Sequence, residues 1–161
     1  MTDKEKVELQ LGKKLKFPFF VAVRCRYGYP VVIATVPLWR GVPFPTVFWL
    51  TCPILNKAVG SLESQGFQNV LEYKGEDEEF LMLRLYIAGL LGVKGKIKFF
   101  PQWGGIAGER KGHIKCLHAH LATYLVTGKG PGKHVWFKVR DVIDNCKGPE
   151  YIKSGINGIS K

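Results

Sequence analysis

The sequence predicts a single α+β domain in which a small mixed sheet is covered by about three helices. Its 161 residues, of which 46% are hydrophobic and 23% charged, match the size and composition of one globular domain. Short runs of β-branched and aromatic residues come first, and apolar residues with helical spacing follow from Pro53 onward. We expect a charged N-terminal arm at residues 1–17, the domain at 18–146 and a loose tail at 147–161.

Three strands are expected before residue 52. Residues 19–26 are rich in Phe and Val and end at a turn marked by Gly28 and Pro30, so residues 31–36 can form a hairpin with them. A loop rich in proline and glycine then leads to residues 46–51, where β-branched and aromatic residues predict the third strand.

Helical spacing of apolar residues begins at Pro53 and ends near Gly66, which predicts the first helix. A second helix is expected at residues 77–91, because acidic residues in its first turn favour the helix dipole. The buried face of this second helix should hold Leu81, Leu85 and Ala88.

A third helix is expected at residues 115–127, where Gly128 ends it. Residues 96–100 predict a short strand, and residues 103–112 predict a glycine-rich loop. Residues 134–139 fit either a further strand or the start of a last helix.

No stretch reaches the roughly 18 consecutive apolar residues that a membrane span needs. The longest uncharged run, residues 41–56, contains three prolines, and residues 1–16 alternate acids and lysines, unlike a signal or transit peptide. Four cysteines are too few for a disulfide scaffold. We expect a cytosolic protein with reduced thiols and no membrane partner.

The formal net charge of +11 is concentrated in residues 94–140, which hold ten Lys and Arg residues against Glu109 alone. All four histidines and several aromatic residues lie in the same stretch. Cations neutralise phosphates and aromatic rings stack on bases, so this composition suits RNA or a phosphorylated metabolite. The alternative is that the basic residues form solvated faces while the aromatic residues pack inside.

Cys52 precedes Pro53, and proline is favoured at the first helical position, so Cys52 should cap the first helix. The positive end of a helix dipole favours a thiolate, which can act as a nucleophile or a metal ligand. A small apolar residue at the corner between strand and helix is the alternative interpretation.

The segment from Lys115 to His120 reads KCLHAH. On a helix, Cys116 and His120 are four residues apart on the side away from the buried leucines, so they could share a metal ion or a proton. His118 lies at the edge of the buried stripe. A buried, hydrogen-bonded histidine is the alternative for this position.

Cys25, Cys52, Cys116 and His118 together supply the ligands of a tetrahedral zinc site. No Cys-x-x-Cys pair supports it, and Cys146 is expected to take no part. Glu63 is the only carboxylate close in sequence to Cys52, so chemistry based on paired carboxylates is disfavoured.

Several pieces together resemble the bacterial family called domain of unknown function 501, over about residues 18–133. They are Arg24-Cys25 with Gly28 and Pro30, residues 43–53 (PFPTVFWLTCP), Leu62-Glu63 and residues 115–119 (KCLHA). The resemblance implies no established activity. It assigns the family pattern to Cys25, Thr51, Cys52, Pro53, Lys115, Cys116 and His118.

The chain departs from this family pattern at two places. Tyr27 stands where many members have a second cysteine, and Thr123 stands where many have a histidine. A metal site that depended on either group would be absent here.

Our leading hypothesis brings the starts of the Cys52 and Cys116 helices to one edge of the sheet. A phosphate-bearing partner, RNA or a phosphorylated metabolite, would bind there. Its anion-binding residues would be Arg24, Thr51, Arg110 and Lys115. The rival hypothesis is an enzyme in which Cys52 or Cys116 is a thiolate nucleophile or a zinc ligand with a histidine partner such as His118. A protein that only contacts other proteins is the third possibility.

Overall fold

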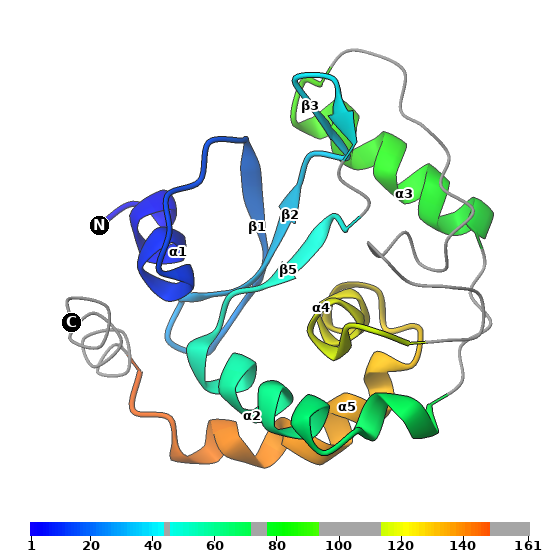
Figure 1. Cartoon of the computed structure of the whole chain (residues 1–161). Helices are drawn as coiled ribbons and strands as arrows, with labels where there is room; N and C mark the ends of the chain where they lie inside the picture. Colours follow the sequence, from blue (N-terminus) through cyan, green and yellow to red (C-terminus); the bar gives the residue numbers. More distant parts are fainter. Residues whose placement is uncertain (44–45, 72–76, 94–113, 149–161) are drawn as a thin grey trace.

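The computed structural model describes residues 1–43, 46–71, 77–93 and 114–148, which form helical layers on both faces of a three-stranded antiparallel sheet (Figure 1). The strands are β1 (Phe19–Arg24), β2 (Pro30–Thr35), β3 (Leu38–Trp39), β4 (Val42–Pro43) and β5 (Phe48–Leu50). The helices are α1 (Asp3–Leu11), α2 (Pro53–Ser64), α3 (Asp77–Leu90), α4 (Leu117–Thr127) and α5 (Gly132–Val139), with 3-10 turns η1 (Phe67–Val70) and η3 (Arg140–Asn145). The predicted α+β class is confirmed. The expected mixed sheet is instead antiparallel throughout the described strands.

The central strand β2 is buried over its whole length because helices cover both of its faces. Val32 and Ala34 point into the main core, whereas Ile33 points to the opposite face. β1 and β5 pair on either side of β2, and the register of β1 shifts after Val21. A strand covered on both sides explains the unbroken apolar sequence PVVIA.

The charged N-terminal segment forms helix α1, which covers one face of the sheet. Thr2 and Glu5 form a capping box at its start, and Gly12 ends it in the left-handed conformation. Val7 is fully buried and packs with Leu15 against Ile33. The segment expected to be a charged arm is therefore a helix that belongs to the domain.

Glu8 ties α1 to the chain that follows it. Its carboxylate accepts the backbone N–H of Leu15 at 3.0 Å and the ammonium group of Lys14 at 3.0 Å. These contacts, the Leu15 N–H first, hold the pKa of Glu8 below its ordinary value of 4.5. The stabilisation by ionised Glu8 is therefore complete above pH 4.5 and is lost as the pH falls through the lower pKa of the folded state.

We expect Glu8→Gln to be less stable than the wild type at neutral pH. The stability difference should disappear under acid conditions, where the wild-type carboxyl is protonated. Urea unfolding of both proteins, followed by circular dichroism between pH 7 and pH 3, measures this difference in the free energy of unfolding. A difference that stays constant over this range would contradict the assignment.

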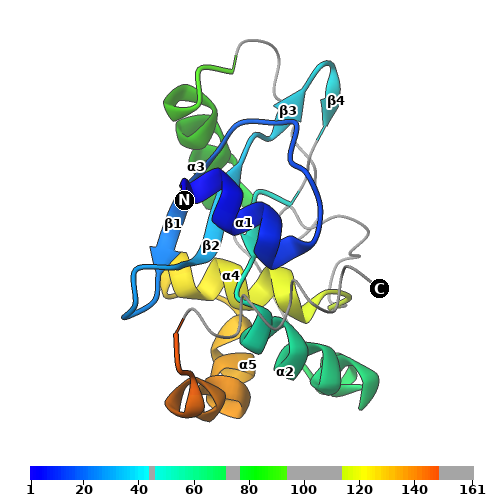
Figure 2. The same ribbon diagram turned by 90° about the vertical axis from the view of Figure 1, so that its left-hand side faces the viewer.

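The other face of the sheet carries α4, and α2 and α5 pack on the far side of α4 (Figures 1 and 2). Leu117 and Leu121 of α4 are fully buried between these layers, with Leu55 and Val59 from α2 and Val135 from α5. The predicted helices at Pro53 and residues 115–127 are confirmed as α2 and α4. Residues 134–139 belong to helix α5 rather than to a strand.

The region expected to be a loop before β5 contains the short hairpin β3–β4. Arg40 and Gly41 at its turn both have positive φ angles, 50° and 77°. This is the backbone of a two-residue turn that matches the twist of paired strands. The predicted strand at residues 96–100 and the glycine loop at 103–112 lie outside the described residues, as does the tail from residue 149 onward.

Helix α3 has the predicted bounds but not the predicted buried face. Leu85 is 44% exposed, whereas Arg84, Ile87 and Ala88 are buried. Of the predicted face, Ala88 alone is buried among the side chains that the structure describes. Every helix within the described ranges is too short or too polar to cross a bilayer.

Candidate functional site

The cysteines and histidines predicted to form one site lie in two separate places. Cys116 and His118 lie with Glu63 between the start of α4 and helix α2. Cys25 and Cys52 line a cavity at the opposite end of α4, where Leu125 is also a wall residue. Leu125, which marks this cavity, lies about 14 Å beyond Cys116 along α4. The four residues predicted to bind zinc are therefore divided between two places, with Cys25 and Cys52 in one and Cys116 and His118 in the other.

Cys116 is the N-cap of α4, whereas the sequence predicted a helix that begins at Lys115 and so placed Cys116 inside it. Its Sγ accepts a hydrogen bond from the backbone N–H of Ala119 at 3.4 Å. The next N–H, that of Leu117, donates to Glu63 Oε1 at 2.9 Å. These two side chains therefore satisfy two of the backbone donors that a helix start leaves open.

His118 is held between two acceptors from α2. Its Nδ1 lies 2.8 Å from Glu63 Oε1, and its Nε2 lies 3.2 Å from the carbonyl oxygen of Asn56. Both partners accept hydrogen bonds, so the ring satisfies both when it carries two protons. Asn56 itself is fixed, because its side-chain amide donates to the carbonyl of Leu50 at 2.9 Å.

The surroundings of His118 favour its charged form and raise its pKa to about 9. The hydrogen bond with Cys116 is the largest cause, and burial of the ring acts in the opposite direction. The hydrogen bond and negative charge of Glu63 and the carbonyl of Asn56 add to the increase.

Glu63, Cys116 and His118 each offer one ligand atom, and these three atoms all lie within 4.8 Å of one another. The side chains of His118 and Glu63 remain 29% and 28% exposed. His120, the predicted partner of Cys116, is instead 3% exposed and is not among these three residues. The cluster is therefore open to solvent on one side and built from two helices.

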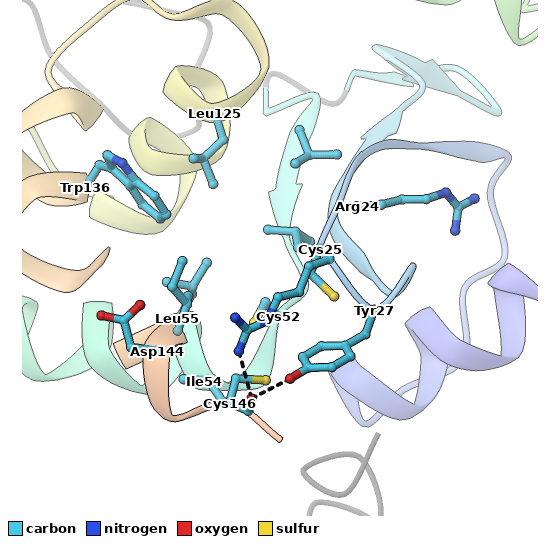
Figure 3. Close-up of a pocket in the computed structure, with 14 residues that line it drawn as sticks. Arg24, Cys25, Tyr27, Cys52, Ile54, Leu55, Leu125, Trp136, Asp144 and Cys146 are labelled. Atoms are coloured by element: carbon cyan, nitrogen blue, oxygen red, sulfur yellow. Dashed lines mark hydrogen bonds between the residues drawn. The ribbon is translucent and has the colours of Figure 1, made fainter. Parts of the chain in front are cut away.

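The second place is a cavity of about 240 Å³ between β1, the start of α2 and the segment after η3 (Figure 3). Cys25, Cys52 and Cys146 line one part of it, and Leu125 and Trp136 line another. Arg26 and the hydroxyl of Tyr27 both donate to the carbonyl oxygen of Cys146, at 3.3 and 3.0 Å. Cys146, expected to take no part, therefore shares this cavity.

Cys52 occupies the N-cap of α2, but its side chain forms no capping hydrogen bond. It is 6% exposed, and burial raises the pKa of its thiol. The alternative interpretation made from the sequence, an apolar residue at the corner between strand and helix, describes these surroundings better than an activated thiolate.

We expect Cys52 to react with iodoacetamide more slowly than free cysteine at neutral pH, because it is buried and its thiol is protonated. Cys116, which is partly exposed, should be alkylated before it. Peptide mass mapping after timed alkylation of the folded protein measures both rates. Faster modification of Cys52 than of free cysteine would show that the dipole of α2 outweighs burial.

Of the predicted anion-binding residues that the structure describes, Arg24 lines the cavity beside Cys25 and Cys52, whereas Lys115 lies at the start of α4. Arg24 forms an ion pair with Asp3, with Nη1 2.9 Å from Oδ1, and Thr51 is fully buried. Lys115 is exposed beside Cys116, and Arg110 lies outside the described residues. The two N-cap cysteines do not line one recess: Cys52 lines the cavity that Leu125 also lines, whereas Cys116 lies with Glu63 and His118, although His118 reaches the carbonyl of Asn56 in the first turn of α2.

A different surface combines exposed cations with an aromatic ring. On α5 and the following residue, Lys133, His134, Phe137, Lys138 and Arg140 are all exposed, and we call them the α5 basic surface. The cationic ends of Lys133 and Arg140 lie 6.0 and 4.9 Å from the centre of the Phe137 ring. Val135 and Val139 on the opposite side of the helix are buried in the core.

A groove runs beside this surface, between η1 and α5. It is lined by Phe67, Val70, Leu71, His134, Phe137 and Lys138. Lys138 also lies 5.9 Å from the centre of the Phe67 ring. No acidic residue occurs within α5 itself, so the groove has a basic wall.

A family model described as Protein of unknown function (DUF501) matches residues 21–88, from β1 into α3. These residues are similar to that family. The resemblance seen in the sequence is confirmed over these residues. No curated protein and no solved structure matches the chain.

The DUF501 match contains Cys25, Cys52 and Glu63 but ends before Cys116 and His118. Sequence reasoning noted Glu63 only as a neighbour of Cys52, and it missed the pairing with His118. The signal was present in Leu62-Glu63, one of the pieces that resemble the family. Cys146 offered no comparable signal, because it follows a turn in a polar stretch.

Proposed function

We propose that the protein binds single-stranded RNA in the cytosol through the α5 basic surface. The observation that carries this proposal is an exposed Phe137 ring on α5, a helix without acids, with the cationic ends of Lys133 from α5 and Arg140 from η3 beside it. Single-stranded nucleic acids bind where cations follow the backbone and aromatic rings stack on bases. This surface replaces the cleft between helix starts that the sequence suggested.

An open surface favours RNA over a phosphorylated metabolite. Small ligands usually bind in concave sites that bury most of their surface. The groove between η1 and α5 is open to solvent, and the exposed residues Phe137 and Lys138 line it. A chain of phosphates can extend along such a surface, whereas a single phosphate would remain largely solvated.

The binding of a labelled single-stranded oligoribonucleotide should weaken steeply as salt increases, because each neutralised phosphate releases counterions. Lys138→Gln should reduce the slope of log K against log salt by about 0.7, the value for one contact on a single strand. Phe137→Ala should weaken binding by about 5-fold to 150-fold, corresponding to the loss of one stacked base. Fluorescence anisotropy measures both effects.

Lys4→Gln is the matched control for the charge change. Lys4 is exposed on α1, on the other side of the sheet, and its loss should leave the slope unchanged. Binding that is constant between low and moderate salt, or equal in the Phe137→Ala and wild-type proteins, would refute the proposal.

The rival function, an enzyme with a thiolate nucleophile, is supported less well by the geometry. A nucleophilic thiol needs a base with a free nitrogen directed at it. His118 does hydrogen-bond with Cys116, but its Nδ1 also lies 2.8 Å from Glu63 and its Nε2 lies 3.2 Å from the carbonyl of Asn56, so both nitrogens are shared with acceptors on α2. The same three side chains fit a metal ligand set, as described next.

A further inference from the structure

We propose that Glu63, Cys116 and His118 form a zinc site with three protein ligands at the start of α4. The proposal is independent of RNA binding, because the cluster shares no residue with the α5 basic surface. It also differs from the zinc set suggested by the sequence, since Glu63 takes the place of Cys25 and Cys52.

The spacing of the three side chains suits a zinc ion with small side-chain adjustments. Zinc bonds of 2.0–2.3 Å place tetrahedral ligand atoms about 3.3 to 3.8 Å apart. The ligand atoms here lie within 4.8 Å of one another, and Glu63 Oε1 and His118 Nδ1 are 2.8 Å apart. A zinc ion would replace the proton that Nδ1 and the carboxylate share.

The second ring nitrogen of His118 has the partner that a zinc-bound histidine needs. A histidine that ligates a metal almost always donates its other N–H to a carboxylate or a backbone carbonyl, which fixes the ring orientation. Nε2 lies 3.2 Å from the carbonyl oxygen of Asn56, within helix α2. Nδ1 is thereby directed at Glu63 and Cys116.

The other two ligands are also held in place before any metal binds. Glu63 accepts the N–H of Leu117, and Cys116 accepts the N–H of Ala119. When zinc binds, these N–H donors would help to hold the carboxylate and the thiolate close together. One thiolate, one carboxylate and one neutral imidazole carry a charge of −2, which balances that of a zinc ion.

The ligand types select zinc over hard cations. Thiolate and imidazole suit zinc, whereas magnesium and calcium prefer oxygen ligands throughout. Three protein ligands leave a fourth position for water, as in catalytic zinc sites. His118 and Glu63 remain partly exposed, so water can reach this position. A zinc-bound water at this site would be acidic enough to ionise near neutral pH.

The test uses the full-length chain stripped with a chelator and titrated with Co²⁺ as a spectroscopic substitute for zinc. We expect one equivalent to bind, with a thiolate-to-cobalt charge-transfer band in the near ultraviolet that Zn²⁺ abolishes and Mg²⁺ does not. Cys116→Ser should remove the band and weaken zinc binding by more than about 100-fold, beyond the effect of losing an outer partner.

Matched variants separate this site from other thiols and imidazoles. Cys146→Ser and His134→Gln should leave the stoichiometry and the band unchanged. Glu63→Gln retains an acceptor for the N–H of Leu117, so this variant should fold. It should bind zinc at least about 10-fold more weakly than the wild type. Circular dichroism checks that each variant is folded. Absence of stoichiometric binding, or a band that persists in Cys116→Ser, would overturn the assignment.

Discussion

Gly132→Ala is expected to destabilise the protein by about 2 to 4 kcal/mol, because α5 crosses α4 too closely for a side chain. A Cβ atom at Gly132 would lie 2.0 Å from the carbonyl oxygen of His120 and 2.7 Å from the Cβ of Tyr124. Neither atom belongs to a flexible side-chain end that could rotate away. The helices would have to separate, which would expose Val135 at their interface.

Gly60→Ala is the matched control for this prediction. Gly60 lies inside α2, and a Cβ there would meet no heavy atom within 4 Å. Alanine should therefore stabilise the protein by about 0.5 to 1 kcal/mol through its higher helix propensity. Urea unfolding at neutral pH measures both variants. Equal stability of the two variants would contradict the conclusion that α5 lies too close to α4 at Gly132 for a side chain.

Local patterns in the sequence were sufficient to predict most elements. The strand at residues 31–36 and the helix from Pro53 were predicted because β-branched runs, proline and glycine act within a few residues. Helix α1 was missed because its alternating acids and lysines contain few apolar residues. Its only fully buried side chain, Val7, is recognised once the sheet face around Ile33 is known.

The site depends on contacts that no local pattern encodes. Glu63 is 55 residues from His118, and their hydrogen bond exists because α2 and α4 pack against each other. The sequence placed Cys116 near a helix start, but it paired Cys116 with His120 from helical spacing alone. His120 is buried beneath α5, so His118 is the histidine that contacts α2.

The charge pattern was informative about composition but not about position. The basic residues in the stretch 94–140 suggested that one region of positive electrostatic potential surrounds the cysteines. Among the described residues, its cations gather on α5, because the apolar residues of that helix occupy the opposite face. Arg24, chosen for its place beside Cys25, forms an ion pair with Asp3 from the N-terminal helix.

Leu121→Ala is expected to destabilise the protein by about 3 to 5 kcal/mol, since the side chain is fully buried between the sheet and α2. Leu85→Ala makes the same chemical change on α3, where Leu85 is 44% exposed, and should alter stability by less than about 0.5 kcal/mol. Helical spacing alone placed Leu85 on the buried face, so the pair distinguishes the two assignments. Urea unfolding of both variants measures the two losses of stability. If Leu85→Ala destabilised the protein as much as Leu121→Ala, Leu85 would be buried, as the sequence predicted. The structure gives a reason for the smaller cost, because Ile87 and Ala88 already fill the inner side of α3.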